Sequence, residues 1–283
     1  MSRVALVTDS TAALSADLVA IHDITVIPLQ VVIGTNSYDE GTEATPEAVA
    51  RALRAKIPVS TSRPGPPTFL RAYERAAQAG AEAVVSVHLS GDMSGTYESA
   101  SLAAADASIP VETVDSRHLG MATGYAVISA ADALAKGAGA PEAAAAARAR
   151  AAVTSALFYV DTLEYLRRGG RIGAAAAFVG SALAVKPLLK VDDGRIGPLE
   201  KVRTSSRAVS RLEDLAVEAA GDLQVDLAVH HLASPDCAST LADRLRNRVP
   251  GLHSLLVCEI GAVIGAHVGP GMLGVVVAPR LND

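Results

Sequence analysis

A loop rich in hydroxyl side chains, residues 89–97, carries the residue types of this chain that are best suited to bind an anion. Its sequence is Leu-Ser-Gly-Asp-Met-Ser-Gly-Thr-Tyr. The apolar run before it, residues 84–89, predicts a buried strand, and the alanine-rich run after it, residues 98–107, predicts a helix. Ser94 and the N–H group of Gly95 are therefore expected at a helix N-terminus, where unpaired backbone donors and the helix dipole favour an anion.

Turns of the same kind are predicted at three other places in the first 120 residues. Strand candidates at residues 3–7, 58–60 and 111–114 each run into a turn that carries Ser, Thr or Asp, and Thr61 and Ser62 belong to the second of these turns. Each turn alone is explained by helix capping. If the strands are parallel, however, all four turns lie at one edge of one sheet, which is where open α/β sheets bind ligands.

Two glycine-containing segments in the second half hold further candidate ligand contacts. Residues 161–172 contain three arginines, of which Arg171 follows the pair Gly169-Gly170 and could bind a carboxylate or phosphate through its guanidinium. Residues 261–271 form a predicted glycine-rich loop around His267. This histidine is either structural or a hydrogen-bond partner of a ligand that the glycines allow to come close.

Several well-known catalytic motifs are absent from the sequence. There is no G-x-S-x-G nucleophile elbow and no phosphate-binding P-loop, and no G-x-G-x-x-G dinucleotide fingerprint follows a predicted strand. His230 and His231 are adjacent in a predicted strand, so that their rings should point to opposite faces and make a poor metal pair. We therefore predict neither a metal site nor a cofactor.

The pattern of elements predicts an α/β chain with two domains. Residues 1–152 alternate strand and helix patterns, as in a parallel-sheet α/β domain, with one strand region at 24–33, a turn at 36–43 and a helix from Thr45. Residues 153–283 read as an α+β domain. Its predicted strands are 155–160, 186–191, 197–201, 227–231, 254–260 and 273–278, and its predicted helices are 162–168, 173–185, 205–219 and 235–248.

Composition limits the class of protein. Half of the 283 residues are hydrophobic but only 3% are aromatic, so the core must consist mainly of Ala, Val and Leu. A net charge of −5 gives no footprint for nucleic acid. The two cysteines, Cys237 and Cys258, are expected to be buried thiols in a reducing compartment. With no signal peptide expected, and with the apolar run 174–185 too short to span a bilayer, the sequence predicts a soluble cytoplasmic protein.

At four segments together, the chain resembles the DegV family of bacterial fatty-acid-binding proteins. These segments are 7–12, 61–64, 89–100 and 161–172, and the later Lys186-Pro187 and residues 267–271 also fit. The resemblance runs in order over the full chain. It implies a two-domain α/β protein with a fatty acid between the domains. It also implies a non-catalytic subunit that presents the fatty acid to a separate fatty acid kinase subunit, which makes an acyl phosphate, with uptake of the lipid near a membrane surface.

The resemblance also assigns roles to particular residues. It implies that the hydroxyl groups of Thr61, Ser62 and Ser94, next to the Gly95 N–H, bind the fatty-acid carboxylate together with Arg171 and His267. Arg203 corresponds to an arginine linked to the encounter with the kinase. Gly65 and residues 91–93 depart from the usual family pattern, which affects the expected ligand selectivity but not the head-group set. Small residues of the 173–185 run, with Ile and Leu, could line an apolar tunnel for the tail.

Two other classes of function remain open at this point. Ser94 could act as a nucleophile with His267 as its base, or the hydroxyl loops could bind a phosphorylated substrate. Neither an orienting carboxylate near His267 nor a Gly-Lys phosphate cradle is visible in the sequence. The third class is an interaction domain whose hydroxyl residues only cap helices.

Overall fold

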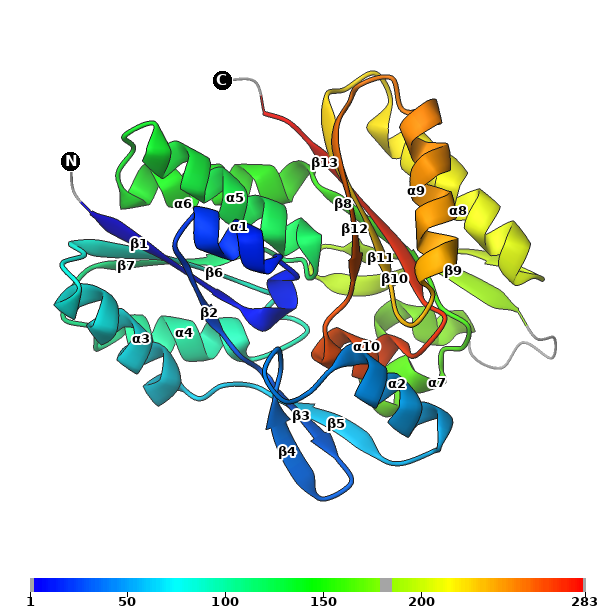
Figure 1. Ribbon diagram of the computed structural model, residues 1–283, viewed down its shortest axis with the longest axis horizontal. Helices are drawn as coiled ribbons and strands as arrows, with labels where there is room; N and C mark the ends of the chain where they lie inside the picture. Colours follow the sequence, from blue (N-terminus) through cyan, green and yellow to red (C-terminus); the bar gives the residue numbers. More distant parts are fainter. Residues whose placement is uncertain (1–2, 179–184, 282–283) are drawn as a thin grey trace. The chain divides into compact units, whose positions relative to one another are not determined.

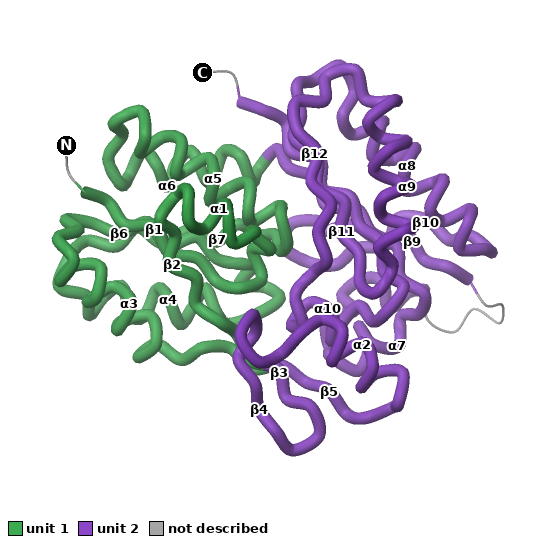
Figure 2. The backbone as a smooth tube through the Cα atoms, in the orientation of Figure 1, with its two compact units in different colours: residues 1–30, 62–152 green, residues 31–61, 153–283 purple. Residues whose placement is uncertain are grey.

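The computed structural model describes residues 3–178 and 185–281. The chain forms two compact units, unit 1 with residues 1–30 and 62–152 and unit 2 with residues 31–61 and 153–283 (Figure 2). The division differs from the predicted one, which placed a single boundary at residue 152 and thus assigned 31–61 to the N-terminal domain. Local sequence pattern predicts strands and a helix in this segment, but it does not show which unit they pack against.

Unit 1 is built on a four-stranded sheet in the order β2-β1-β6-β7, in which every neighbouring pair is parallel. The strands are β1 (Val4–Asp9), β2 (Ile24–Ile27), β6 (Ala83–His88) and β7 (Val111–Asp115). Leu6 pairs with Ile24 on one side and with Val85 on the other. This is the parallel-sheet domain that the sequence predicts.

Helices cover both faces of the unit 1 sheet (Figure 1). They are η1 (Ser10–Ala12), α1 (Ala16–Ile21), α3 (Pro66–Gln78), α4 (Thr96–Ala105), α5 (Met121–Ala135) and α6 (Ala140–Val153). Leu6 and Val85 face the alanines of α5 and α6, whereas their neighbours Val7 and Val84 face Phe69 of α3. Alternating side chains thus build two cores, and alanine-rich helices can pack closely on the sheet.

Unit 2 contains a six-stranded mixed sheet in the order β10-β9-β8-β13-β11-β12. Its strands are β8 (Ser155–Tyr159), β9 (Lys186–Asp192), β10 (Arg195–Val202), β11 (Val225–His231), β12 (Leu252–Glu259) and β13 (Leu273–Pro279). Helices α8 (Ser205–Ala220) and α9 (Pro235–Arg248) pack against this sheet through a buried aliphatic core that includes Leu212, Leu227 and Leu241. The predicted fold class, a parallel-sheet domain with a mixed α+β domain, is confirmed.

A smaller part of unit 2 brings residues 31–61 together with the C-terminal region. A three-stranded sheet has the order β4-β3-β5, with β3 (Gln30–Ile33), β4 (Asn36–Asp39) and β5 (Val59–Ser62). Helix α2 (Pro46–Arg54) packs on α10 (Ala262–Val268), and α10 packs on α7 (Glu164–Arg168). The 3-10 helix η2 (Gly173–Phe178) lies beside β10.

Several local predictions need correction. The strand region 24–33 is interrupted at Pro28-Leu29, and the predicted turn at 36–43 begins with strand β4. The predicted loop 261–271 contains helix α10. Strand β5 belongs to the small sheet, so that only the turns after β1, β6 and β7 share the edge of the parallel sheet. Of the predicted helix 173–185, the first six residues form η2, and residues 179–184 lie outside the described part.

Candidate functional site

A hydrogen bond between Thr61 and His267 forms the centre of the candidate site in unit 2. Thr61 lies on β5 and His267 near the end of α10, and Oγ1 of Thr61 is 2.9 Å from Nε2 of His267. Burial, and secondly the nearby Arg171 guanidinium, lowers the pKa of His267 from its ordinary 6.5 to about 4. The imidazole is therefore neutral at pH 7.

The proton of this neutral ring is best placed on Nε2. Its Nδ1 atom is buried and has no hydrogen-bond partner among the described residues. Nδ1 faces the Cα of Gly169, where a Cβ atom would overlap the ring. Since an N–H group buried without an acceptor is costly, the tautomer with Nε2–H donating to Thr61 Oγ1 is favoured. The Thr61 hydroxyl hydrogen then remains available for another acceptor.

The two glycine-containing segments that the sequence singles out separately pack against each other. In addition to Gly169 beneath His267, a Cβ atom on Gly269 would overlap the Tyr165 ring, and one on Gly271 would come within 2.6 Å of a carboxylate oxygen of Asp161. Gly269 also has a φ of +77°, which favours glycine. These glycines therefore allow the end of α10 to approach residues 161–172 closely.

Arg171 and Asp161 have defined partners at this place. Nη1 of Arg171 donates to the carbonyl oxygen of Gly169 at 2.6 Å, and the Arg171 side chain remains exposed. Lys186 Nζ pairs with Asp161 Oδ1 at 2.8 Å, and the hydroxyl of Tyr159 bonds to the same carboxylate. The partial burial of Asp161 is offset by these hydrogen bonds from Lys186 and Tyr159, so that its pKa lies below the ordinary value.

Glu40 holds the other end of α10 and was not predicted from the sequence. Its Oε1 accepts a hydrogen bond from the N–H of Val263 at 2.7 Å, and only 6% of the residue is exposed. A Cβ atom on Gly261 would overlap this carboxylate. In addition to the packing of α2, residues 31–61 thus contact α10 through Glu40 at its first turn and through Thr61 near its end. No local signal could reveal a contact over 223 positions of sequence.

The hydroxyl loop of unit 1 lies where the sequence predicts it, between β6 and α4. Oγ of Ser94 is 2.9 Å from Oγ1 of Thr96, and Gly95 is the N-cap residue of α4, without a capping side chain. The guanidinium of Arg63 lies directly over Gly95, so close that a Cβ atom on this residue would overlap it. Ser62 is exposed at the end of β5. A hydroxyl, a helix N-terminus and a cation therefore meet in this loop, and Arg63 is a residue that sequence reasoning did not select.

A fully buried polar chain fixes the loops at the ends of β1 and β6. Asp9 accepts hydrogen bonds from the N–H groups of Thr11 and Leu89, at 3.0 and 3.1 Å, and Oδ2 of Asp9 is 3.0 Å from Nδ1 of His88. His88 Nε2 is 2.7 Å from Ser86 Oγ, which is 2.9 Å from the Tyr73 hydroxyl. Burial raises the pKa of Tyr73 to about 12.

The buried side chains Ser86, His88 and Asp9 are the residue types of a serine-hydrolase triad, but they are not accessible to a substrate. Ser86, His88 and Asp9 each have 0% exposed surface, so that no substrate can reach Ser86. The other possible nucleophile, Ser94, bonds to Thr96, and His267 bonds to Thr61. Among the described residues, no carboxylate hydrogen-bonds to His267. The alternative of a serine-dependent enzyme gains no support from these partners.

The remaining candidates are placed as follows. Arg203 is exposed just before α8, and His230 is buried, which lowers its pKa to about 4. Cys258 is half-buried, at 3.3 Å from Nδ1 of His230, but Cys237 is exposed in the first turn of α9, contrary to the prediction. Cys237 lies on the exposed side of α9, whereas the buried side of this helix carries Ala238, Leu241 and Leu245.

The described ranges contain neither a metal-binding cluster nor a membrane-spanning helix. In residues 3–178 and 185–281, no cluster of three or more His, Cys, Asp or Glu side chains could hold a metal ion. None of the helices described there is long and apolar enough to cross a membrane.

Comparisons with known proteins agree over nearly the whole chain. The family model of DegV matches residues 3–280. A DegV domain-containing protein of Streptomyces coelicolor is 57% identical over 281 residues, which cover 99% of this chain and 100% of the relative. Protein DegV of Bacillus subtilis is 37% identical over 280 residues, 96% of this chain and 98% of the relative.

Solved structures give the same result. A DegV family protein from Thermus thermophilus, for which fatty acid binding is described, superposes with a TM-score of 0.92 at 33% identity. The superposition covers 98% of this chain and 100% of the Thermus thermophilus chain. DegV from Bacillus subtilis, described as a fatty acid binding protein, has a TM-score of 0.90 at 33% identity, with 99% and 100% covered.

Proposed function

Because this chain belongs to the DegV family, we propose that it binds a long-chain fatty acid and that the Thr61–His267 pair binds the carboxylate. The observation that carries this proposal is the neutral His267 bonded to Thr61. With Nε2–H donating to Oγ1, Thr61 can donate its own hydrogen to a carboxylate oxygen. A carboxylate that leaves water needs such donors.

Arg171 supports the carboxylate by charge. Its guanidinium helps to lower the pKa of His267, so it lies close enough to act electrostatically on that ring. His267 in turn bonds to the Thr61 hydroxyl that is proposed to bind the ligand carboxylate. A bound carboxylate would be attracted by Arg171 and would meet a neutral rather than a competing cationic imidazole. The head group is thus oriented by one donor chain and one cation.

The acyl tail supplies most of the binding free energy. Each methylene group removed from water contributes roughly 0.8 kcal/mol, so that a long chain gains far more than the polar head group. The head-group contacts then select an acid over a neutral lipid and fix the direction in which the chain is held.

Ser62, Ser94 and Gly95 remain proposed contacts of the ligand. In unit 1 the Ser94 hydroxyl, the α4 N-terminus and the Arg63 guanidinium offer donors and positive charge to an anion. Their separate substitution tests this part of the proposal independently of Thr61 and His267.

The proposed role is that of a carrier without catalytic activity of its own. It would present the fatty acid to a separate kinase subunit that forms an acyl phosphate, with the exposed Arg203 as a contact of that subunit. The solved structures of relatives that are described as binding fatty acids support the proposed class of ligand. The transfer to a kinase subunit is a further part of our proposal.

Mass spectrometry of the purified protein tests the ligand directly. We expect a native mass that exceeds the sequence mass by one fatty acid, and release of that acid in stoichiometric amount after denaturation and organic extraction. A bare protein that also takes up no added oleate would contradict the proposal.

A further inference from the structure

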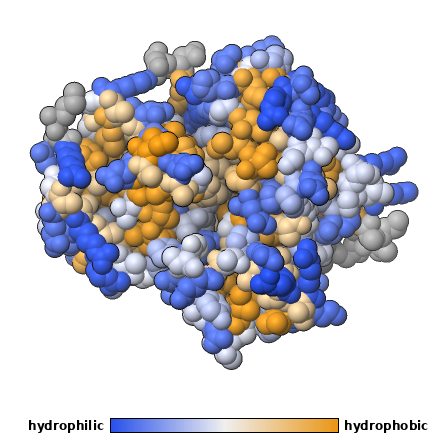
Figure 3. Space-filling model, in the orientation of Figure 1, coloured by the Kyte–Doolittle hydropathy of each residue, from blue (hydrophilic) through white to orange (hydrophobic). Residues whose placement is uncertain are grey.

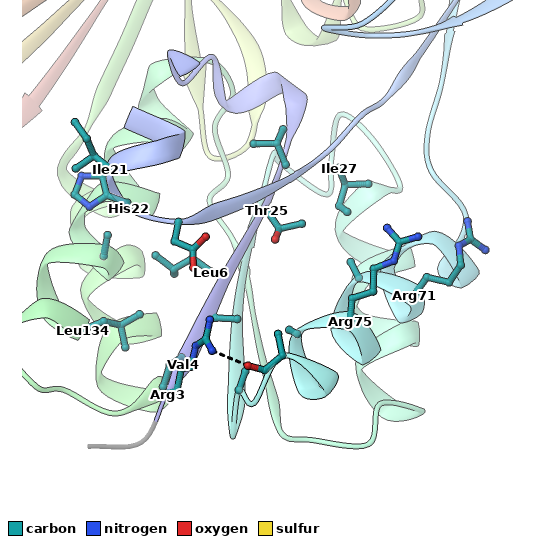
Figure 4. A pocket seen from close by; sticks show the side chains of 18 of the residues that line it. Arg3, Val4, Leu6, Ile21, His22, Thr25, Ile27, Arg71, Arg75 and Leu134 are labelled. Carbon is teal, nitrogen blue, oxygen red and sulfur yellow. Dashed lines mark hydrogen bonds between the residues drawn. The ribbon is translucent and has the colours of Figure 1, made fainter. Parts of the chain in front are cut away.

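Unit 1 contains an open cavity that shares no residue with the proposed fatty-acid site. Its volume is about 810 Å³, and it runs along β2, the edge strand of the parallel sheet (Figure 4). The first half of β1, one side of α3 and the ends of α1 and α5 complete its walls. This volume lies within the range of cavities that bind small molecules.

Three arginines border this cavity without a carboxylate partner in the described part of the chain. Arg3 donates to the carbonyl oxygen of Ala79 at 2.6 Å, and Arg71 to the hydroxyl of Thr68 at 3.2 Å. The side chain of Arg75, one helical turn from Arg71 on α3, makes no hydrogen bond or ion pair within the described residues. Figure 4 shows Arg71 and Arg75 side by side.

The contrast with other arginines of the protein is clear. Arg211 binds Glu200 at 2.8 Å, and Arg248 binds Glu213 at 2.7 Å. The cavity has one acidic residue in its lining, Asp23, which follows the end of α1, whereas Arg71 and Arg75 belong to α3. The α3 side of the cavity therefore carries uncompensated positive charge.

The rest of the lining is mainly apolar. Val4, Leu6, Ile27, Ala72 and Leu134 belong to it, and Ile21, with 73% of its surface exposed, lies at its border. Figure 3 shows apolar residues gathered over α1 and β2, with hydrophilic residues over α3. An apolar floor beside a pair of guanidinium groups matches a ligand that has an apolar body and an anionic head.

We propose that this cavity binds an anionic amphiphile, with a phosphate or carboxylate head between Arg71 and Arg75 and its apolar body on the β2 side. Guanidinium groups form paired, charge-assisted hydrogen bonds with such oxyanions. An acidic peptide that pairs with the edge of β2 is the competing occupant. That strand has four residues and offers few backbone groups, whereas the mainly apolar lining offers contact area to an alkyl chain.

Calorimetric titration with dodecyl phosphate, below its micelle concentration, tests this site. The protein is loaded beforehand with one molar equivalent of oleate, and uptake is checked by native mass spectrometry. Failure of the proposed fatty-acid site is then recognised separately, and the cavity along β2 is left open to the titrated ligand. We expect saturable binding of one dodecyl phosphate, and weaker responses to inorganic phosphate and to dodecanol, which each present half of the ligand's chemistry.

Two variants locate the binding. The double variant Arg71→Ala, Arg75→Ala should bind dodecyl phosphate at least about tenfold more weakly, since each lost charge-assisted bond is worth that much. Thr25→Trp, which introduces a large side chain at an exposed position of β2 inside the cavity, should also abolish binding. The control Arg51→Ala, Arg54→Ala removes the same charge from exposed positions of α2 and should bind normally.

The outcomes separate the sources of the ligand. Arginine-dependent binding of soluble dodecyl phosphate supports a free amphiphile, and arginine-dependent sedimentation with phosphatidic acid vesicles supports the same head group in a bilayer lipid. If neither binds, if the double variant binds as well as the unchanged protein, or if only an acidic peptide such as acetyl-(Glu-Val)₃-amide binds, the proposal is overturned.

Discussion

Oγ1 of Thr61 and Nε2 of His267 lie 2.9 Å apart although 206 positions of sequence separate the two residues. The bond links a strand of the small sheet to the last turn of α10, and it uses a histidine that is neutral at pH 7. When the Nε2–H of a neutral His267 donates to Thr61 Oγ1, the threonine hydroxyl can donate its own hydrogen to a further acceptor. In the proposed function, this pair is therefore the part of the candidate site that we expect to select the head group of the ligand.

Thr61→Val removes the hydroxyl but keeps the shape of the side chain. We expect the affinity for oleate to fall about tenfold, because one hydrogen bond to a charged group is lost, while the free energy of unfolding changes by about 1 kcal/mol. Titration with oleate and urea unfolding measure the two effects. The control Thr42→Val alters an exposed threonine of the same segment. Equal oleate binding by both variants would remove Thr61 from the site.

The pKa of His267 makes stability depend on pH in one direction. Because burial lowers that pKa to about 4, the unfolded chain takes up a proton at this ring at higher pH than the folded chain. The stability linked to the ring is complete above about pH 6.5 and is lost as pH falls toward 4, on the order of 3 kcal/mol in all.

His267→Asn should remove this part of the pH dependence. Urea unfolding at several pH values between 7 and 4 should show a smaller loss of stability for the variant than for the unchanged protein. His253→Asn, at an exposed position, should follow the unchanged protein. The buried His230, whose pKa is also about 4, contributes equally to all three proteins. Parallel curves for the His267 variant and the unchanged protein would refute the assignment.

Gly169→Ala tests the close approach of the glycine to His267. The φ of Gly169 is −74°, so alanine meets no backbone strain, but its Cβ atom would overlap Nδ1 of the imidazole. We expect a loss of about 1–3 kcal/mol of stability and weaker oleate binding, since the ring must move away from Thr61. Gly197→Ala is the control, because its nearest atom would lie 3.6 Å away. A fully stable Gly169 variant with normal oleate affinity would speak against the described packing.

Asp9→Asn tests the buried polar chain of unit 1. One of the groups that now donate to Asp9 would face an amide N–H instead of a carboxylate oxygen, so we expect a loss of about 2–4 kcal/mol in the free energy of unfolding. Hydrogen exchange should become faster at Thr11 and Leu89, which donate to Asp9. The exposed Asp132→Asn serves as control. Unchanged exchange at these two amides would mean that Asp9 does not hold the loops.

Much of the fold follows from signals within short stretches of sequence. The sequence predicts helix α9 at its observed bounds, Pro235–Arg248, where proline stands at the first position and an apolar face recurs with helical spacing. The hairpin of β9 and β10 turns at Asp193 and Gly194, which have φ values of 45° and 79°, as the Asp-Gly sequence predicts. In both cases the residues that determine the structure are neighbours in the chain.

The features that sequence did not reveal depend on distant residues. Helix α10 was predicted as a loop because glycines at 261, 265 and 269 weaken a helix locally. Its first turn is stabilised by Glu40, and its packing needs α2 and α7. In the same way, the residue types of Thr61 and His267 suggested a site, but only the fold brings the two side chains together.

The assignment of residues 31–61 to unit 2 has a consequence for biosynthesis. The segment leaves the ribosome early, whereas α10, which receives both its Glu40 cap and its Thr61 bond, is made some 200 residues later. Unit 1 has all its strands once residue 152 has emerged, but unit 2 must wait for α10 and β13. A nascent chain that ends before α10 would therefore lack the packing of α2 on α10 and the hydrogen bond from Val263 to Glu40, so that the proposed site can form only after α10 has been made.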